Sequence, residues 1–436
     1  MTALPVVPPH ELDNIDLADP RLHAENDLSE VWRRLREERP FYWQRPRGSQ
    51  PGFWAVTRHA DATAVYKDRE NFTAERGNVL PMLVAGGDAA ARTMLAVTDG
   101  VRHTQMRAIL TRAFSPRMLM KIKDTLTRTV DQLLADAAAG GGCDFATDVS
   151  GNVPLAAICD LLAIPETDRK YLLNLTGHVL SSDYADAPPE EGAVAKNEIL
   201  LYFADLAETR RGSDETDVVS LLANSTIDGK PLNAAELMAN CYGLIIGGDE
   251  TGRHAITGGL LALMEHRDQW QALKRGEADL KTATEEVLRW TVPPLHGGRY
   301  ATADTVVNGE QLIKAGEIVS VWFASANRDE RTFAEPDRFD LNRTPNKHLT
   351  FATGSHYCLG HFLARMEVEA TLDGLRRTVS DFEQTAPEKW IYSSVLQGMS
   401  SLPVSLEARR QPSGTGGQTA PQEPLRKGIG HGQPVR

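Results

Sequence analysis

The sequence has few cysteines and no paired ones. Only four occur in 436 residues, at Cys143, Cys159, Cys241 and Cys358, and no CxxC spacing is present. This pattern excludes a disulfide framework and the usual ligand spacing of a zinc site. We therefore expect a reducing, cytoplasmic setting.

Long apolar runs and net positive charge are also missing. The N-terminal stretch MTALPVVPPHELDN has neither the basic start nor the apolar run of a signal peptide or membrane anchor. The chain has 47 Lys and Arg against 59 Asp and Glu, a net charge of −12. Because phosphate binding needs a basic face, nucleic acid is not expected as the main partner.

The hydrophobic pattern of the chain is mostly that of amphipathic helices. Apolar residues recur every three or four positions in 28–39, 59–68, 102–113, 117–138, 153–163, 167–180, 193–210, 233–265, 268–274, 281–290 and 359–377. Strand-like stretches are few, at 53–57, 298–309, 317–323 and about 401–408. The sequence predicts a mainly α fold with a small β portion to one side.

The chain shows no internal repeat and no linker-like break between 21 and 409, so we expect one domain there. Residues 1–20 are rich in proline and acid and are predicted to form an N-terminal lead. Residues 410–436 are rich in Gly, Pro and Gln and are predicted to be a disordered tail.

The segment from Asn233 to His266 has no proline, and its pattern predicts a helix of some thirty residues. Such a helix is about 50 Å long and crosses an entire domain. Its middle reads GLIIGGDETGRHA, with two glycines and two acids where a core helix normally has aliphatic residues. Each glycine costs a helix interior roughly 1 kcal/mol relative to alanine, so the pair calls for a functional reason.

Cys358 lies in the loop FATGSHYCLG, directly before a predicted helix. The simplest structural interpretation is that Cys358 is a small, buried apolar side chain. A thiolate before a helix is stabilised by the unpaired amides and the dipole, which favours a nucleophile or a metal ligand instead. Companion zinc ligands are absent, and His356 is poorly placed as a base. A single thiolate bound to haem iron needs neither.

The cysteine loop resembles the haem-binding signature of the cytochromes P-450. Phe351, Gly354, His356, Cys358 and Gly360 match that pattern at every defined position. The resemblance extends in order over about residues 20–409. It implies the P-450 fold, with a long central helix over the haem, and Cys358 as the iron ligand.

The glycine and acid cluster is similar to the family's oxygen-activation motif. The resemblance implies that Gly247 and Gly248 make a groove for dioxygen, where the helix is expected to widen locally. It implies that Glu250 and Thr251 deliver protons to the distal oxygen. Gly252 stands where a second threonine is frequent in the family.

Two further sets of residues follow from the resemblance. Glu286 and Arg289, one helical turn apart, look like the family's buried structural pair. The predicted partners of the haem propionates are His103, Arg107, Arg299 and His356. The substrate pocket is expected to draw on segments 78–97 and 171–190, and on Leu83, Val84, Gly243, Leu244, Pro294, Leu295, His296 and Leu396.

The implied activity is a haem-thiolate monooxygenase that uses haem b and dioxygen. No Rossmann-type glycine motif is visible, so electrons from NAD(P)H are expected through a ferredoxin and its reductase. The mainly aliphatic pocket predicts a mid-sized, largely apolar substrate. A tailoring step in secondary-metabolite or antibiotic biosynthesis is favoured, including one on a carrier-tethered acyl or aminoacyl group. A steroid, terpene or fatty-acid hydroxylase, a peroxide-driven peroxygenase and a non-catalytic recruitment platform are the alternatives.

Overall fold

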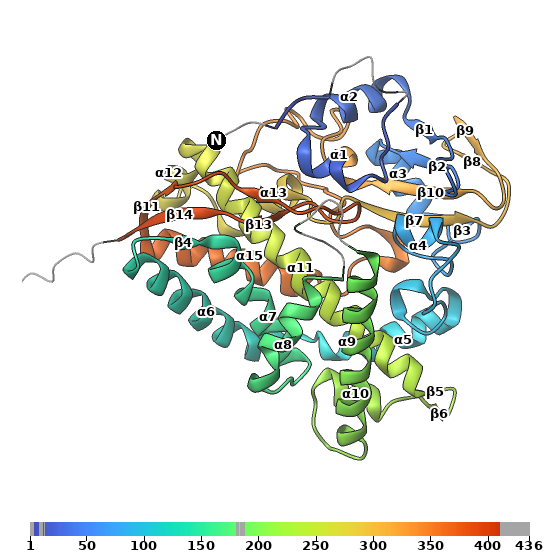
Figure 1. Ribbon diagram of the computed structural model, residues 1–436, viewed down its shortest axis with the longest axis horizontal. Coiled ribbons are helices and arrows are strands. Elements are labelled where there is room, and N and C mark those ends of the chain that lie inside the picture. Colours follow the sequence, from blue (N-terminus) through green and yellow to red (C-terminus); the bar gives the residue numbers. More distant parts are fainter. Residues whose placement is uncertain (1–3, 8–11, 13, 180–182, 184–187, 410–436) are drawn as a thin grey trace, which may run out of the picture.

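The computed structural model describes residues 4–7, 12, 14–179, 183 and 188–409. Helices make up most of this part, and small sheets lie to one side of them (Figure 1). The mainly α fold expected from the sequence is confirmed. The predicted tail at 410–436, and parts of the predicted N-terminal lead and of segment 171–190, lie outside the described residues.

The longer helices match the periodic segments of the sequence. They are α2 (Ser29–Glu38), α3 (His59–Lys67), α5 (Gly100–Ala113), α6 (Pro116–Ala139), α7 (Asn152–Leu161), α8 (Glu166–Thr176), α9 (Pro189–Arg210), α11 (Ala234–Glu265), α12 (Arg267–Arg275), α13 (Leu280–Thr291) and α15 (His361–Thr378). The shorter ones are α1 (Pro20–Glu25), α4 (Leu80–Val84), α10 (Val218–Ala223), α14 (Phe323–Ala326), η2 (Leu95–Val97), η3 (Phe145–Ser150) and η4 (Gly354–His356).

The largest sheet has the strand order β1-β2-β10-β7-β3. Its strands are β1 (Phe41–Gln44), β2 (Phe53–Val56), β3 (Phe72–Thr73), β7 (His296–Ala301) and β10 (Ile318–Trp322). A second sheet contains β4 (Cys143–Asp144), β11 (Val379–Gln384) and β14 (Pro403–Ala408). Three hairpins pair β5 (Thr226–Ile227) with β6 (Lys230–Pro231), β8 (Thr305–Val307) with β9 (Gln311–Ile313), and β12 (Lys389–Trp390) with β13 (Met399–Ser401).

Helix α11 is the centre of the fold. It begins with a capping box in which the Asn233 side chain accepts from the Glu236 amide and Glu236 accepts from the Asn233 amide. It is α-helical for 32 residues, so the expected local widening at the glycines is not seen. It contacts α7, α9, α13 and α15, which together bury most of its length.

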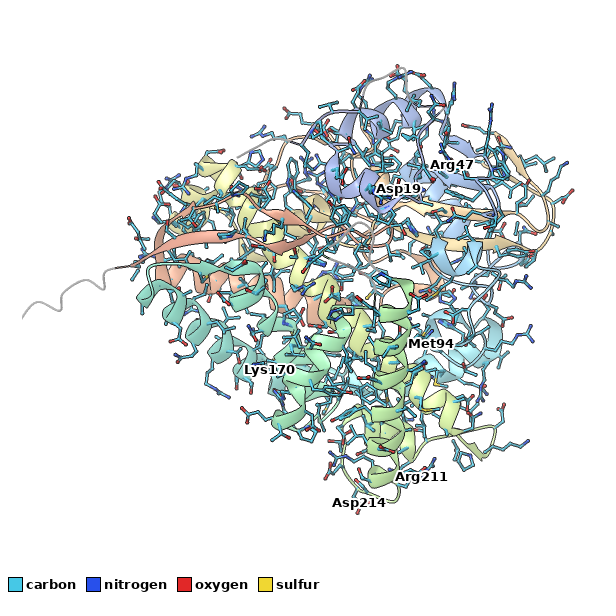
Figure 2. The ribbon with its side chains drawn as sticks, in the orientation of Figure 1. Asp19, Arg47, Met94, Lys170, Arg211 and Asp214 are labelled. Atoms are coloured by element: carbon cyan, nitrogen blue, oxygen red, sulfur yellow. The ribbon has the colours of Figure 1, made fainter. Side chains whose placement is uncertain are left out.

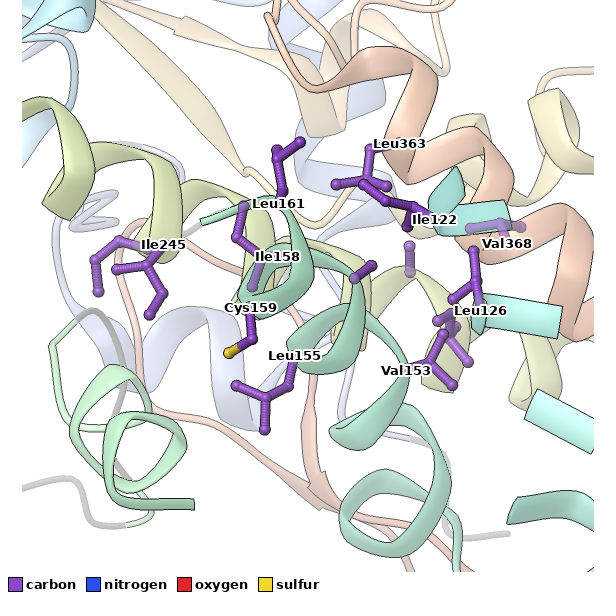
Figure 3. Packing of buried hydrophobic residues seen from close by; sticks show 14 of the residues in the cluster. Ile122, Leu126, Val153, Leu155, Ile158, Cys159, Leu161, Ile245, Leu363 and Val368 are labelled. Atoms are coloured by element: carbon purple, nitrogen blue, oxygen red, sulfur yellow. The ribbon is translucent and has the colours of Figure 1, made fainter. Parts of the chain in front are cut away.

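Close packing fixes α11 against α7 and α15. Figure 3 shows Ile158 and Leu161 of α7 between Ile245 of α11 and Leu363 of α15. A Cβ added to Gly248 would lie 2.8 Å from Ile158. This glycine therefore lets α7 approach the backbone of α11, which is a packing reason for a residue that is costly in a helix.

Candidate active site

A cavity of about 370 Å³ lies between α11 and the cysteine loop. Its wall includes residues of both predicted centres, with Gly247, Gly248 and Thr251 from α11 and Phe351, His356, Cys358 and Gly360 from the loop. The four predicted propionate partners, His103, Arg107, Arg299 and His356, also line it. Segments far apart in the sequence thus meet at one site.

The cysteine loop is held by its backbone. The Cys358 amide donates to the Phe351 carbonyl over 3.0 Å, and Gly354 adopts φ +74°. A Cβ on Gly354 would lie 2.7 Å from the Tyr66 carbonyl oxygen, so only glycine fits this turn. Helix α15 begins three residues after the thiol, at His361.

Burial raises the pKa of the Cys358 thiol, whereas the amide of Gly360, which hydrogen-bonds the sulfur, and the charge of Arg107 lower it. Arg107 also donates from Nη2 to the Tyr357 carbonyl over 2.6 Å. A metal ligand must be deprotonated. The amide of the loop and the Arg107 cation of α5 therefore stabilise the sulfur, when it is ionised, in this apolar surrounding.

The cationic edge of the cavity combines residues from three elements. The rings of His103 (α5) and His356 are 4.4 Å apart, and His356 Nε2 is 2.7 Å from a carboxylate oxygen of Asp99. The Arg299 guanidinium, on β7, lies 4.1 Å from the ring centre of Tyr66. The side chains are thus packed and oriented before any ligand is added.

Unpaired polar atoms test whether a haem fits here. The buried atoms His103 Nε2 and Arg299 Nη2 have no hydrogen-bond partner among the described residues. Buried groups of this kind normally have partners, and two propionate carboxylates would supply acceptors for an imidazole N–H and a guanidinium. A Cβ on Gly360 would meet only Phe114, at 3.9 Å, and one on Gly247 would meet nothing within 4 Å. Both glycines border open space, as a flat group between them requires.

Of the alcohol and the acid of the motif, Thr251 lines the cavity on its α11 side, whereas Glu250 does not. The Thr251 hydroxyl donates to the Gly247 carbonyl over 2.9 Å, which fixes its direction. The Glu250 carboxylate is fully buried and lies 2.8 Å from Arg253 Nη2 and 3.4 Å from His254 Nε2. Although burial raises its pKa, the charge of Arg253 and the contact with His254 lower it further, and the net shift is downward.

Glu286 and Arg289 form the centre of a buried ion-pair network. Arg289 binds Glu286 through two N–H···O bonds of 2.8 Å, and neither side chain is exposed. Arg343 adds a further bond of 3.0 Å to Glu286. Arg289 also donates to the carbonyls of Asn327 and Pro336. The pair therefore fastens the segment after β10 to α13.

The predicted substrate-pocket residues divide into two groups. Gly243, Leu244, Pro294 and His296 line the cavity, whereas Leu83, Val84, Leu295 and Leu396 do not. Leu295 lies between two lining residues in an extended segment, so its side chain points to the opposite face and joins a core cluster with Leu83. Val84 packs against that cluster, and Leu396 belongs to a small separate one. The structure thus places these four side chains in neighbouring core clusters and not on the cavity wall.

Met94 lies within the segment 78–97 that was predicted for the pocket, whereas Ile158 and Glu367 were not singled out from the sequence. Met94, labelled in Figure 2, packs its sulfur 2.9 Å from where a Cβ on Gly243 would be. Ile158 of α7 and Glu367 of α15 also line the cavity. Glu367 stands four residues after Leu363, which lines the cavity too, and this helical spacing is the signal that could have found it.

Comparison with known proteins identifies the family. Residues 280–389 match the family model described as Cytochrome P450. The chain is 64% identical to "Cytochrome P450 NovI" of Streptomyces niveus over 93% of its own length and all of that protein. It is 31% identical to "Steroid C26-monooxygenase" of Mycolicibacterium smegmatis over 90% of this chain and 96% of that one.

A solved structure agrees with these sequence relatives. The structure of P450 OxyD, described as involved in the biosynthesis of vancomycin-type antibiotics, superposes with a TM-score of 0.82 at 34% identity, covering 91% of this chain and all of that one. The fold and site thus define a haem enzyme of the oxygenase class. The chain belongs to the cytochrome P450 family and is a P450 monooxygenase. As such it uses haem and dioxygen and receives electrons from partner proteins.

Within the described residues, no helix is both long and apolar enough to cross a membrane.

Proposed function

We propose that this enzyme inserts one oxygen atom into a C–H bond of a mid-sized, largely apolar molecule, with Cys358 as the ligand of a haem b. The observation that carries the proposal is the cavity that joins Cys358 to Gly247 and Thr251 of α11. When bound, the haem supplies the iron at which dioxygen is reduced and cleaved. A thiolate-type spectrum of the reduced, carbon-monoxide-bound protein tests the assignment.

The chain's own residues have separate tasks in this proposal. His103, Arg107, Arg299 and His356 would hold the propionates by charge-assisted hydrogen bonds. Gly247 leaves space at α11, since nothing of the protein lies within 4 Å of its missing Cβ. The α11 wall of the cavity is largely apolar, so in this proposal protons arrive through side chains.

Thr251 and Glu250 are proposed to provide that proton route. The Thr251 hydroxyl lines the cavity and is oriented by the Gly247 carbonyl. Glu250 is adjacent in sequence, and Arg253, which is partly exposed, links it toward solvent. In this proposal, a proton taken up at Glu250 passes to the Thr251 hydroxyl, which is held in place at the cavity.

We expect Thr251→Ala to lower coupled turnover about 100-fold, because general acid–base groups contribute at least that much. Hydrogen peroxide released per NADH consumed, with a surrogate ferredoxin system, should rise at the same time. Thr257→Ala is the matched control, since Thr257 donates to the Arg253 carbonyl over the same 2.9 Å without lining the cavity. Equal peroxide release by the two variants contradicts the role of Thr251.

The substrate is proposed to be a secondary-metabolite intermediate, including an acyl or aminoacyl group tethered to a carrier protein. The cavity wall is mainly aliphatic and aromatic, with few polar side chains, as in sites for apolar ligands. The similarity to OxyD, a P450 of antibiotic biosynthesis, supports this choice over a steroid, terpene or fatty acid. A screen of free compounds and carrier-bound acyl groups for the iron spin-state shift tests it.

Gly243→Ala should alter ligand affinity about tenfold, the effect of roughly one methylene in an apolar pocket. The added methyl would lie 2.9 Å from the Met94 sulfur and push that flexible side chain into the cavity. Spin-state titration with the tightest compound of the screen measures the change. Adding Met94→Ala should restore the affinity, and failure to do so contradicts this account.

Electrons are proposed to come from NAD(P)H through a ferredoxin and its reductase in the cytoplasm. The cysteine side of the molecule presents the exposed cation Arg112 on α5. Phe362, in the first turn of α15, is 57% exposed close to the cysteine loop. An exposed cation and an exposed aromatic side chain are features that suit an acidic partner with an apolar centre.

Arg112→Glu should slow the reduction by ferredoxin about tenfold or more at low salt, because electrostatic steering changes association rates by that order. Reduction under carbon monoxide measures the rate directly. Lys170→Glu on α8 serves as the control (Lys170 is labelled in Figure 2). An unchanged rate in the Arg112 variant dismisses this docking surface.

The alternatives make different predictions. A peroxygenase turns over with peroxide as fast as with the ferredoxin system, and a recruitment platform turns over with neither. Neither a peroxygenase nor a recruitment platform requires the buried carboxylate of Glu250 or the oriented hydroxyl of Thr251. Their presence on α11 supports the monooxygenase.

A further inference from the structure

One buried polar side chain in the cavity wall has no part in the mechanism above. Asn240 stands on α11, seven residues before Gly247, and both residues line the cavity. Seven residues are about two helical turns, so the two share one face of the helix. Asn240 is only 2% exposed. A carboxamide is costly to bury unless it forms hydrogen bonds, so its presence in a largely apolar wall calls for a reason.

The carboxamide of Asn240 bonds three backbone groups. Its Oδ1 accepts from the Leu95 amide over 2.9 Å, and its Nδ2 donates to the Thr93 carbonyl over 2.9 Å. Nδ2 also donates to the Glu236 carbonyl, one turn back on α11, over 2.7 Å. Only one orientation of the amide satisfies all three partners. Both N–H groups are used within the protein, so Asn240 has none left to donate to a substrate.

Two of these bonds hold residues 92–97, the wall loop, against α11. Met94, Leu95 and Ala96 of this loop line the cavity. The wall loop is closed on itself, because the Arg92 amide donates to the Val97 carbonyl over 2.9 Å while Arg92 adopts φ +62°. A residue other than glycine rarely adopts that conformation. The wall loop thus has a defined shape, and Asn240 fixes its place.

The wall loop touches α11 at a second point, one turn further along. The sulfur of Met94 lies 2.9 Å from where a Cβ on Gly243 would be. This contact is apolar and depends on a flexible side chain, whereas the bonds of Asn240 reach the backbone. Among the described residues, the hydrogen bonds that join the wall loop to α11 are those of Asn240.

Loss of the Asn240 side chain would change the wall in two ways. The Leu95 amide and the Thr93 carbonyl would lose their partner, and unpaired backbone groups at an apolar cavity attract water. The wall loop would also lose its polar attachment to α11. Both changes affect a ligand large enough to reach this wall and spare a ligand that is not.

We propose that Asn240 is a positioning residue for substrate selection, which holds the wall loop against α11 and so fixes the surface that a substrate must fit. It acts through Met94, Leu95 and Ala96 and makes no contact with the reacting atoms. The substrates it favours have a rigid apolar part that packs against this wall. This inference rests on the proposed function.

Hydrogen–deuterium exchange of the haem-loaded enzyme tests the attachment directly. In the wild type the Leu95 amide should exchange slowly, although Leu95 is only half-buried. In Asn240→Ala its exchange should be about tenfold faster or more, the effect of losing one hydrogen bond of ordinary strength.

Asn224→Ala is the matched control for this measurement. Asn224 Oδ1 accepts from the Gly212 amide over 2.7 Å, and its Nδ2 donates to the Arg210 carbonyl over 2.9 Å. The chemistry is the same, but Asn224 is exposed and does not line the cavity. This variant should leave the exchange of the Leu95 amide unchanged.

Two iron ligands of different size test the effect on selection. Imidazole is small, whereas phenylimidazole adds an apolar ring that needs room between the walls. We expect Asn240→Ala to weaken phenylimidazole about tenfold and to leave imidazole unchanged, measured by the shift in haem absorbance. A general loss of structure would weaken both ligands alike.

The possible results separate the claims. A Leu95 amide that exchanges freely in the wild type overturns the attachment, and that measurement needs no variant to fold. An equal ratio of the two affinities in Asn240→Ala and the wild type overturns the role in selection. If the carbon-monoxide complex of the wild type lacks the thiolate-type spectrum, the proposed function itself fails.

Discussion

Replacing Cys358 with serine is expected to abolish the thiolate-type spectrum of the carbon-monoxide complex and all ferredoxin-driven turnover. The sulfur is the one cavity-lining thiol among the described residues, and the Gly360 amide and the Arg107 cation of α5 lower its pKa. A serine hydroxyl is far less acidic than a thiol and donates less electron density to iron. The expected loss in turnover is therefore at least about 1000-fold, the scale of a group that enables the chemistry outright.

The control for this experiment is Cys143→Ser. Cys143 is a half-buried thiol on β4 whose pKa burial raises to about 12, and it does not line the cavity. This variant should keep the spectrum, the pigment and the turnover rate. A Cys358→Ser protein that retains the thiolate-type spectrum would refute the site.

Arg289→Ala should destabilise the fold by about 3–5 kcal/mol, the cost of leaving one partner of a buried ion pair uncompensated. Glu286 would keep its contacts to Arg343 but lose both bonds to Arg289. The carbonyls of Asn327 and Pro336 would lose their donor as well. We expect little soluble protein and poor retention of haem, measured by chemical denaturation and by the ratio of haem absorbance to protein.

Arg211→Ala is the matched comparison. Arg211 pairs with Glu208 at the same three-residue spacing, but both side chains are exposed on and after α9. Surface pairs contribute at most about 1 kcal/mol, so this variant should unfold like the wild type. Equal stability of the two variants would contradict a structural role for the buried pair.

The sequence was most informative where periodic patterns are long. The predicted helix at 233–265 became α11 (Ala234–Glu265), because an uninterrupted apolar pattern and a capping residue leave few alternatives. The stretch at 298–309 became two strands, β7 and β8, separated by a break that alternation alone does not mark. Short strands such as β1 and β11 were missed because a few residues of alternation are too short a signal to stand out.

The sequence predicted site residues only where they belong to a motif with fixed spacing. Cys358 and Thr251 stand in motifs with defined positions, and the structure places them on one cavity. Ile158 comes from a segment without such spacing, so only the packing of α7 against α11 brings it there. The helical spacing from Leu363 could have indicated Glu367, whereas its close contact with Gly252 of α11 could not be predicted from either segment.

The continuity of α11 restricts how this enzyme can change its specificity. Gly243, on the substrate side, and Thr251, on the oxygen side, belong to one rigid rod. Inserting or deleting a single residue between them would turn one set by about 100° relative to the other. A new substrate specificity can therefore arise by exchanging side chains or by changing the surrounding loops. Insertions and deletions within α11 would instead break the alignment of Gly243 with Thr251.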